Sequence, residues 1–144
     1  PHALAMPQES IMSNPMTAIR ALLLLALFSI AGLARADSRF EAFTPERFAA
    51  LQTEGKTIVI DVWAPWCPTC RNQAPKLDAL LAEPAFAGFV GLKLHWDDQR
   101  ELAKQLGAPR QSTVFVFKGS EQRAMSVAET DLDRLREVYR TGLE

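Results

Sequence analysis

The two cysteines of the chain, Cys67 and Cys70, lie three positions apart in the sequence Trp-Cys-Pro-Thr-Cys at residues 66–70. An apolar, β-branched run precedes them at residues 57–64, and apolar residues at helical spacing follow them. Cysteines at this spacing, where a strand turns into a helix, can form a reversible disulfide. The first sulfur would lie at the helix N-terminus, where free N–H groups and the helix dipole favour a thiolate. The pattern therefore predicts exchange between thiols and a disulfide.

The composition argues against two other classes of function. The chain has 144 residues, 16 basic and 17 acidic, with a net charge of −1, so no electrostatic binding of nucleic acid is expected. Two cysteines and two histidines do not readily supply the four ligands of a zinc site. His95 has no second candidate ligand near it in the sequence, and we interpret it as a strand or surface histidine. No metal site is predicted, and the length suits one globular domain.

The N-terminal residues have the pattern of a secretory signal peptide. Arg20 provides a basic start, residues 21–33 are apolar, and the Ala-Arg-Ala sequence at 34–36 is typical of a cleavage site. Fourteen uncharged residues lie between the two arginines, fewer than the roughly 20 that a membrane-spanning helix needs. We expect cleavage after Ala36, with retention as an N-terminal anchor as the alternative. The expected segments are an upstream stretch without regular structure at 1–15, a signal peptide at 16–36 and one domain at 37–144.

The rest of the chain alternates between strand and helix patterns. A helix is expected to begin at Thr44 and Pro45, another at the cysteines with a kink at Pro75, a third capped by Asp98, and a last one capped by Thr130 or Asp131. The elements after a short entry at 37–43 are predicted as helix to 53, strand 57–64, helix from 67 to about 83, strand 89–96, helix 99–106, strands 113–117 and 122–127, and a final helix. This order predicts an α/β fold with a mixed sheet.

Residues 61–70, together with Arg71 and Pro75, resemble the thioredoxin family, and the resemblance extends over residues 37–144. It implies the thioredoxin fold, a central mixed sheet of four to five strands with helices on both faces. It also implies that Cys67 is an exposed nucleophile and that Cys70 is the buried resolving thiol. By the same resemblance Asp61 is the buried acid that accepts a proton and Lys93 is its partner. No cofactor beyond the redox-active Cys67–Cys70 disulfide is expected.

The chain departs from the family pattern at Ser112. The resemblance places a cis-proline opposite the disulfide, whereas this chain has Gln111 followed by Ser112. A cis bond between these residues would cost about 2.5–4 kcal/mol, so we expect a trans bond or a reshaped loop. Residues expected to contact a partner are Trp66, Pro68, Thr69, Gln111, Ser112 and Thr113.

These observations predict a monomeric periplasmic thiol–disulfide oxidoreductase. We expect it to reduce disulfides of exported proteins, because neither Pro68 nor Thr69 can place a positive charge beside Cys67. The family resemblance suggests a membrane thiol transporter as electron donor. One alternative is a metal-binding or metal-delivery protein that uses the cysteine pair in copper or cytochrome assembly. The other is a non-catalytic interaction module.

Overall fold

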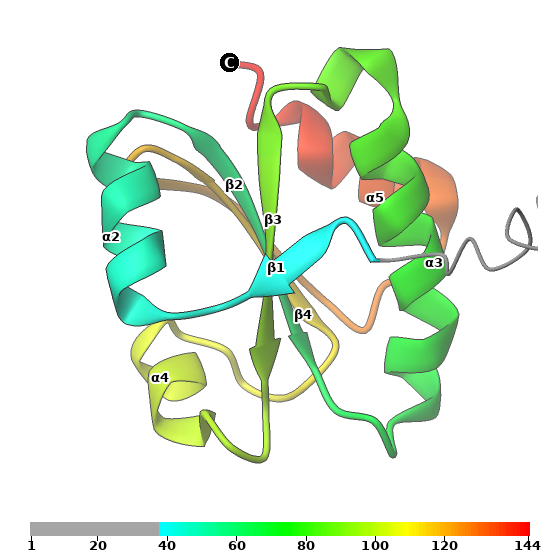
Figure 1. Ribbon diagram of the computed structural model, residues 1–144. Helices are drawn as coiled ribbons and strands as arrows, with labels where there is room; N and C mark the ends of the chain where they lie inside the picture. The colour runs from blue at the N-terminus through cyan, green and yellow to red at the C-terminus, as the bar shows by residue number, and fades with distance from the viewer. Residues whose placement is uncertain (1–37) are drawn as a thin grey trace, which may run out of the picture. The chain divides into compact units, whose positions relative to one another are not determined.

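The computed structural model describes residues 38–144, and the expected upstream segment and signal peptide at 1–36 lie outside them. A five-stranded mixed sheet has the order β1-β3-β2-β4-β5, which confirms the predicted sheet (Figure 1). In chain order the elements are β1 (Phe40–Ala42), α2 (Pro45–Thr53), β2 (Thr57–Trp63), α3 (Pro68–Ala82), the 3₁₀ turn η1 (Pro84–Phe86), β3 (Phe89–His95), α4 (Arg100–Gln105), β4 (Thr113–Lys118), β5 (Glu121–Val127) and α5 (Leu132–Arg140).

Strand β2 lies at the centre of the sheet and determines which residues reach the site. It pairs with β3 in parallel, in a register that places Asp61 opposite Lys93, and with β4 in antiparallel orientation. All but its last residue are buried, as expected of a strand that is covered on both faces.

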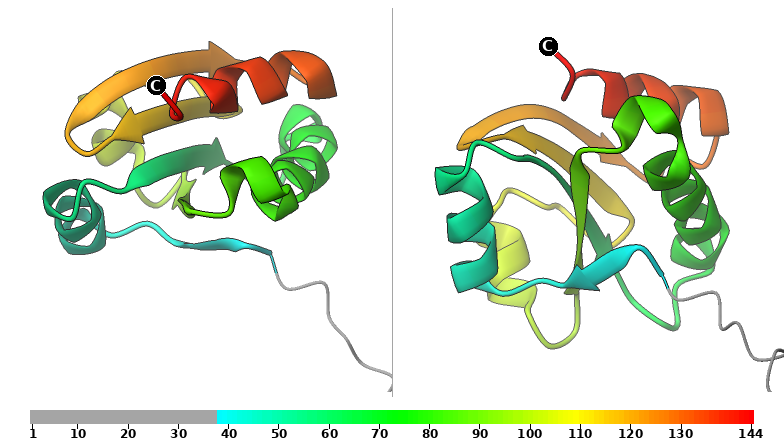
Figure 2. Two further views of the ribbon diagram at one scale, coloured as in Figure 1. Left: turned by 90° about the horizontal axis from the view of Figure 1, so that it is seen from above. Right: turned by 45° about the horizontal axis from the view of Figure 1, so that its top comes forward.

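Helices cover both faces of the sheet, with α2 and α4 on one face and α3 and α5 on the other (Figures 1 and 2). Alternate residues of β2 therefore enter two separate cores. Ile58, Ile60 and Val62 pack in the core under α2 and α4. Val59 packs in the core formed with α3 and α5, where the other members include Leu77, Leu80, Leu135 and Tyr139.

Local capping signals explain where most helices begin. The Thr44 side chain accepts a hydrogen bond from the Arg47 N–H at 3.1 Å, and Asp131 accepts one from the Arg134 N–H at 3.0 Å. Both helix starts agree with the sequence. The expected cap at Asp98 is wrong, because α4 begins one residue later, after Gln99, without a side-chain cap. Asp98 instead lies 3.1 Å from His95 Nδ1.

Within residues 38–144 we find no helix with both the length and the apolar character needed to cross a bilayer.

Gly91 provides a test of how tightly β3 packs under α3. A Cβ atom at Gly91 would lie 2.6 Å from Leu81 Cδ1 and 2.8 Å from Phe40 Cδ1. Gly91→Ala should therefore lower the free energy of unfolding by about 1–3 kcal/mol, measured by urea denaturation. The matched control is Gly88→Ala, where a Cβ meets nothing within 4 Å, and we expect a change within about 0.5 kcal/mol. Equal effects of the two substitutions would contradict the packing described here.

Candidate dithiol site

The two cysteines lie at the N-terminus of α3, where β2 has just left the sheet. Cys67 is the N-cap residue of the helix, and its sulfur accepts a hydrogen bond from the Cys70 N–H at 3.2 Å. Pro68 follows at the first helical position, where a backbone N–H would have no partner within the helix, so its absence costs no hydrogen bond. A sulfur thus takes the place of the oxygen that usually caps a helix. Both cysteines are free thiols in this structure.

The expectation that Cys67 is exposed is wrong. Cys67 and Cys70 each have only 2% of their surface accessible, and they pack with Ala64 against Trp63 and Trp96. Both cysteines are therefore shielded by near neighbours in the sequence and by Trp96, which lies far from them in the sequence.

The two thiols have pKa values that move in opposite directions. Burial raises the pKa of Cys67, but hydrogen bonds from Cys70, Ser112 and Gln111 outweigh it and lower the pKa below its ordinary value. Burial is also the main reason that the pKa of Cys70 is raised, and its hydrogen bond to Cys67 adds to the effect. The first sulfur is thus the one that ionises more readily.

Ser112 occupies the position at which the family resemblance led us to expect a proline. No peptide bond in residues 38–144 is cis, which confirms the expectation for the Gln111–Ser112 bond. Ser112 instead adopts a positive φ of 61°. Its hydroxyl lies 3.2 Å from the Cys67 sulfur and 3.0 Å from the Cys70 sulfur. The sequence pointed to this position by the missing proline but not to the contact with both sulfurs.

Asp61 lies inside the protein on β2, with 2% of its surface accessible. Its Oδ2 is 3.9 Å from Lys93 Nζ, while Oδ1 has no hydrogen-bond partner. Burial raises the pKa of Asp61 from 3.8 to about 7, although Lys93 opposes the shift and Asp78 adds to it. Lys93 also lies over the Trp63 ring, 4.7 Å from its centroid. The structure thus brings the two residues together, as a loose ion pair.

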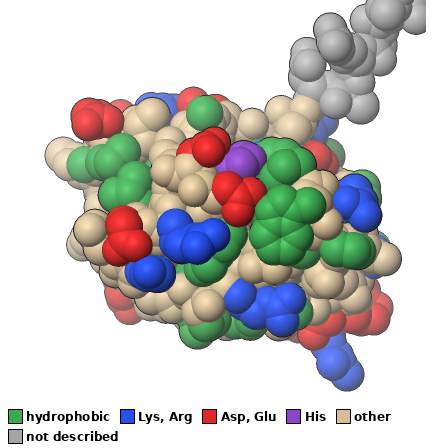
Figure 3. Space-filling model, turned by 90° about the horizontal axis from the view of Figure 1, so that it is seen from below, with side chains coloured by type: hydrophobic (Ala, Val, Ile, Leu, Met, Phe, Trp, Pro, Cys, Tyr) green, Lys and Arg blue, Asp and Glu red, His purple; other side chains and the backbone are tan. Residues whose placement is uncertain are grey.

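Trp66 is the most exposed large hydrophobic side chain in the described part of the chain, with 55% of its surface accessible. Its indole N–H donates to Asp97 Oδ2 at 2.8 Å, which fixes the ring beside the start of α3. Pro68 is exposed, while Thr69 and Gln111 are partly exposed. Figure 3 shows hydrophobic side chains gathered among charged ones on the lower end of the molecule as drawn in Figure 1.

The side chains of Ser112 and Thr113 are buried, and the expectation that these residues contact a partner stays a prediction. The Thr113 hydroxyl donates to the Arg110 carbonyl at 2.6 Å, and the Ser112 hydroxyl faces the sulfurs. Gln111 is the one residue of these three whose surface is partly accessible.

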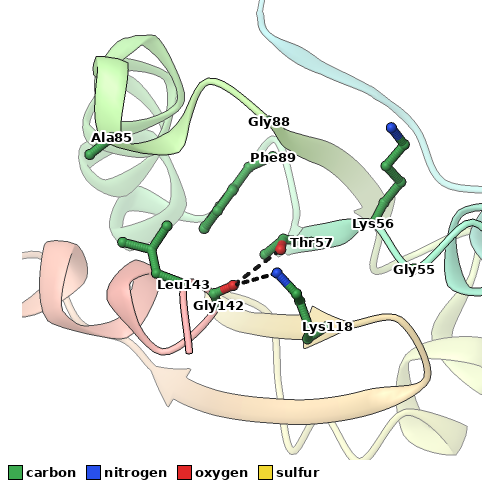
Figure 4. Close-up of a pocket in the computed structure, with 9 residues that line it drawn as sticks. All are labelled: Gly55, Lys56, Thr57, Ala85, Gly88, Phe89, Lys118, Gly142 and Leu143. Carbon is green, nitrogen blue, oxygen red and sulfur yellow. Dashed lines mark hydrogen bonds between the residues drawn. The ribbon is translucent and has the colours of Figure 1, made fainter.

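A separate hollow of about 280 Å³ lies at the opposite end of β2, beside the C-terminal turn (Figure 4). Thr57 Oγ1 and Lys118 Nζ both donate to the Gly142 carbonyl there, at 3.1 and 3.5 Å. Because Thr57 and Trp63 are the two ends of a seven-residue strand, roughly 20 Å separates this hollow from the cysteines. None of its lining residues is a cysteine, a histidine or a carboxylate. It is therefore not part of the dithiol site.

Residues 40–141 match the thioredoxin family profile. The chain is 34% identical over 86 residues to thioredoxin from Synechocystis, which covers 57% of this chain and 78% of that protein. It is 36% identical over 67 residues to the M-type chloroplastic thioredoxin of Zea mays, which covers 46% of this chain. The matched segments span only 39% of the maize protein and 60% of thioredoxin from Porphyra purpurea.

Among solved structures, the crystal structure of Trxlp from Edwardsiella tarda is similar, with a TM-score of 0.64 and 27% identity, covering 67% of this chain and 96% of that one. Thioredoxin from Halobacterium salinarum, at 21% identity and a TM-score of 0.65, shares the fold. The profile match, the five-stranded sheet and the cysteine pair at the start of α3 lead to one conclusion. This chain belongs to the thioredoxin family.

Proposed function

We propose that this chain is a thiol–disulfide oxidoreductase that reduces disulfides of exported proteins. The observation that supports it most is the Cys67 sulfur at the N-terminus of α3, where it accepts the Cys70 N–H and has a lowered pKa. A thiolate is the form of cysteine that attacks disulfides. Cys70 lies one helical turn further on, within reach of the same sulfur.

The reaction consists of two exchange steps at one sulfur. The Cys67 thiolate attacks a partner disulfide, so that a mixed disulfide forms and one partner thiolate leaves and takes up a proton. The Cys70 thiol then loses its proton and attacks Cys67, which forms the Cys67–Cys70 disulfide and releases the second partner sulfur as a thiol. Two electrons pass from the cysteine pair to the partner.

Asp61 is suited to accept the proton that Cys70 must lose. With a pKa of about 7, it is partly ionised near neutral pH and can bind or release a proton there. Lys93, 3.9 Å away, compensates part of its charge when it is ionised.

The charges near the sulfurs support the proposed direction of transfer. Strong oxidants of this kind require a heavily stabilised reduced form. Pro68 and Thr69 carry no charge, and the Arg71 guanidinium donates to the Pro65 carbonyl at 3.0 Å. The absence of a cation between the cysteines supports a reducing role. A membrane thiol transporter would then return the electrons.

Export is supported by the sequence of residues 16–36. A basic start, an apolar stretch and the Ala-Arg-Ala sequence suit secretion into the periplasm, where protein disulfides persist. The domain at 37–144 would act there as a monomer on protein substrates after cleavage behind Ala36, or remain tethered if the signal is retained.

The Cys70→Ser variant of the full chain should trap the first step. We expect mixed disulfides between Cys67 and exported proteins in the periplasmic fraction, because the resolving thiol is absent. They are detected as adducts that a reductant releases, and mass spectrometry identifies the partners. The control is Cys67→Ser, which should trap none. Adducts that persist in Cys67→Ser, or partners confined to the cytoplasm, would contradict the proposal.

The raised pKa of Asp61 predicts how stability depends on pH. Because the carboxyl ionises near pH 3.8 when unfolded and near 7 when folded, the free energy of unfolding should fall as pH rises between these values, by on the order of 4 kcal/mol. Asp61→Asn should abolish this fall, as measured by urea denaturation of the reduced protein across that range. It should also slow release of the mixed disulfide at neutral pH.

Glu101→Gln serves as the control, since Glu101 is an exposed carboxylate on α4. It should retain the pH dependence of the unsubstituted protein. Parallel stability profiles for Asp61→Asn and the unsubstituted protein would rule out the buried titration.

A further inference from the structure

The Ser112 hydroxyl contacts both sulfurs of the pair. It lies 3.2 Å from the Cys67 sulfur and 3.0 Å from the Cys70 sulfur, and Ser112 has no accessible surface. A buried hydroxyl needs hydrogen-bond partners within the protein, and the two sulfurs are the partners within its reach. The Ser112 hydroxyl is therefore placed where it can affect the protonation and the redox state of both sulfurs.

The backbone holds this hydroxyl in place from two sides. The Ser112 N–H donates to the Val62 carbonyl at 2.7 Å, and the Ser112 carbonyl accepts the Ala128 N–H at 2.8 Å. The residue has a φ of 61°, which costs a residue other than glycine roughly 1–2 kcal/mol. These two bonds join the end of β2 to the segment after β5, so the side chain is held against the cysteines.

A hydroxyl can donate one hydrogen bond and accept others. In the reduced pair it can donate to the Cys67 thiolate, to which the Cys70 thiol also donates. In the disulfide neither sulfur is charged and neither carries a proton, so these bonds are weaker or absent. The hydroxyl therefore interacts more strongly with the reduced form than with the oxidised form.

We propose that the Ser112 hydroxyl stabilises the reduced cysteine pair by direct contact and thereby makes it a weaker reductant than the same centre without the hydroxyl. This inference rests on the proposed exchange reaction. In that reaction one thiolate, one thiol, one partner disulfide and one proton give the Cys67–Cys70 disulfide and two partner thiols. Removal of the hydroxyl shifts this equilibrium towards the protein disulfide.

The surroundings of the sulfurs are consistent with this role. Burial raises the pKa of Cys67, and the bonds from Cys70 and Ser112 are the largest contributions that lower it. The cations Arg71 and Lys93 are engaged elsewhere, since Arg71 donates to a backbone carbonyl and Lys93 faces Asp61. The neutral hydroxyl is thus the main side chain outside the cysteine pair that stabilises the thiolate.

Two substitutions separate the hydroxyl from the backbone geometry. Ser112→Ala removes the hydroxyl but keeps the Cβ atom and its strain at φ 61°, whereas Ser112→Gly removes both. In glutathione buffers of known composition, each variant should shift the equilibrium about tenfold towards the disulfide, equivalent to a potential about 30 mV more negative. Each should also raise the pKa of Cys67, followed by thiolate absorbance in the reduced protein.

Ser126→Ala is the matched control, since Ser126 on β5 lies opposite Val114, two residues beyond Ser112. It should leave both quantities unchanged. The inference is overturned if the equilibrium constants of Ser112→Ala and Ser112→Gly both stay within twofold of that of the unsubstituted protein. It is also overturned if only one of these two variants shifts, or if Ser126→Ala shifts equally. If the unsubstituted protein itself never forms the Cys67–Cys70 disulfide, the proposed function fails first, so the two failures are distinguishable.

Discussion

The hydrogen bond from the Cys70 N–H to the Cys67 sulfur, at 3.2 Å, is the interaction on which the rest of the site depends. It satisfies one of the free N–H groups at the start of α3 and stabilises negative charge on that sulfur. Its geometry requires a strand that ends at Trp63 and a helix that begins at Pro68. The central position of β2 and the N-terminal proline of α3 are therefore requirements of the chemistry as well as of the fold.

Two buried ionisable groups in this small domain are shifted in opposite senses for different reasons. At Asp61 the loss of solvent dominates, because Lys93 is 3.9 Å away and one carboxylate oxygen has no hydrogen-bond partner. At Cys67 the hydrogen bonds dominate, because three neighbouring residues direct donors at one sulfur. In the proposed reaction the thiol that ionises early makes the attack, and the acid that titrates near neutral pH accepts the proton that Cys70 loses. The buried carboxylate lowers stability above its ordinary pKa, which is the physical consequence of placing such a group in the core.

The sequence was sufficient wherever the signal is local. The apolar run that became β2, the capping residues Thr44 and Asp131, and the cysteine pair at a helix start depend on neighbours a few positions away. The start of α4, the burial of Cys67 and the conformation of Ser112 depend on contacts between segments distant in the sequence. The missing proline indicated that the loop before β4 would be unusual. Only the packing of β2, β5 and α3 around that loop shows that its serine faces both sulfurs.

Alkylation of the reduced protein across a pH series, with modification of each cysteine followed separately by mass spectrometry, tests the central interaction most directly. Cys67 should react first and ionise at a pH below that of free cysteine, whereas Cys70 should react only at higher pH. Two thiols that titrate alike, each as free cysteine does, would contradict a thiolate held at the start of α3.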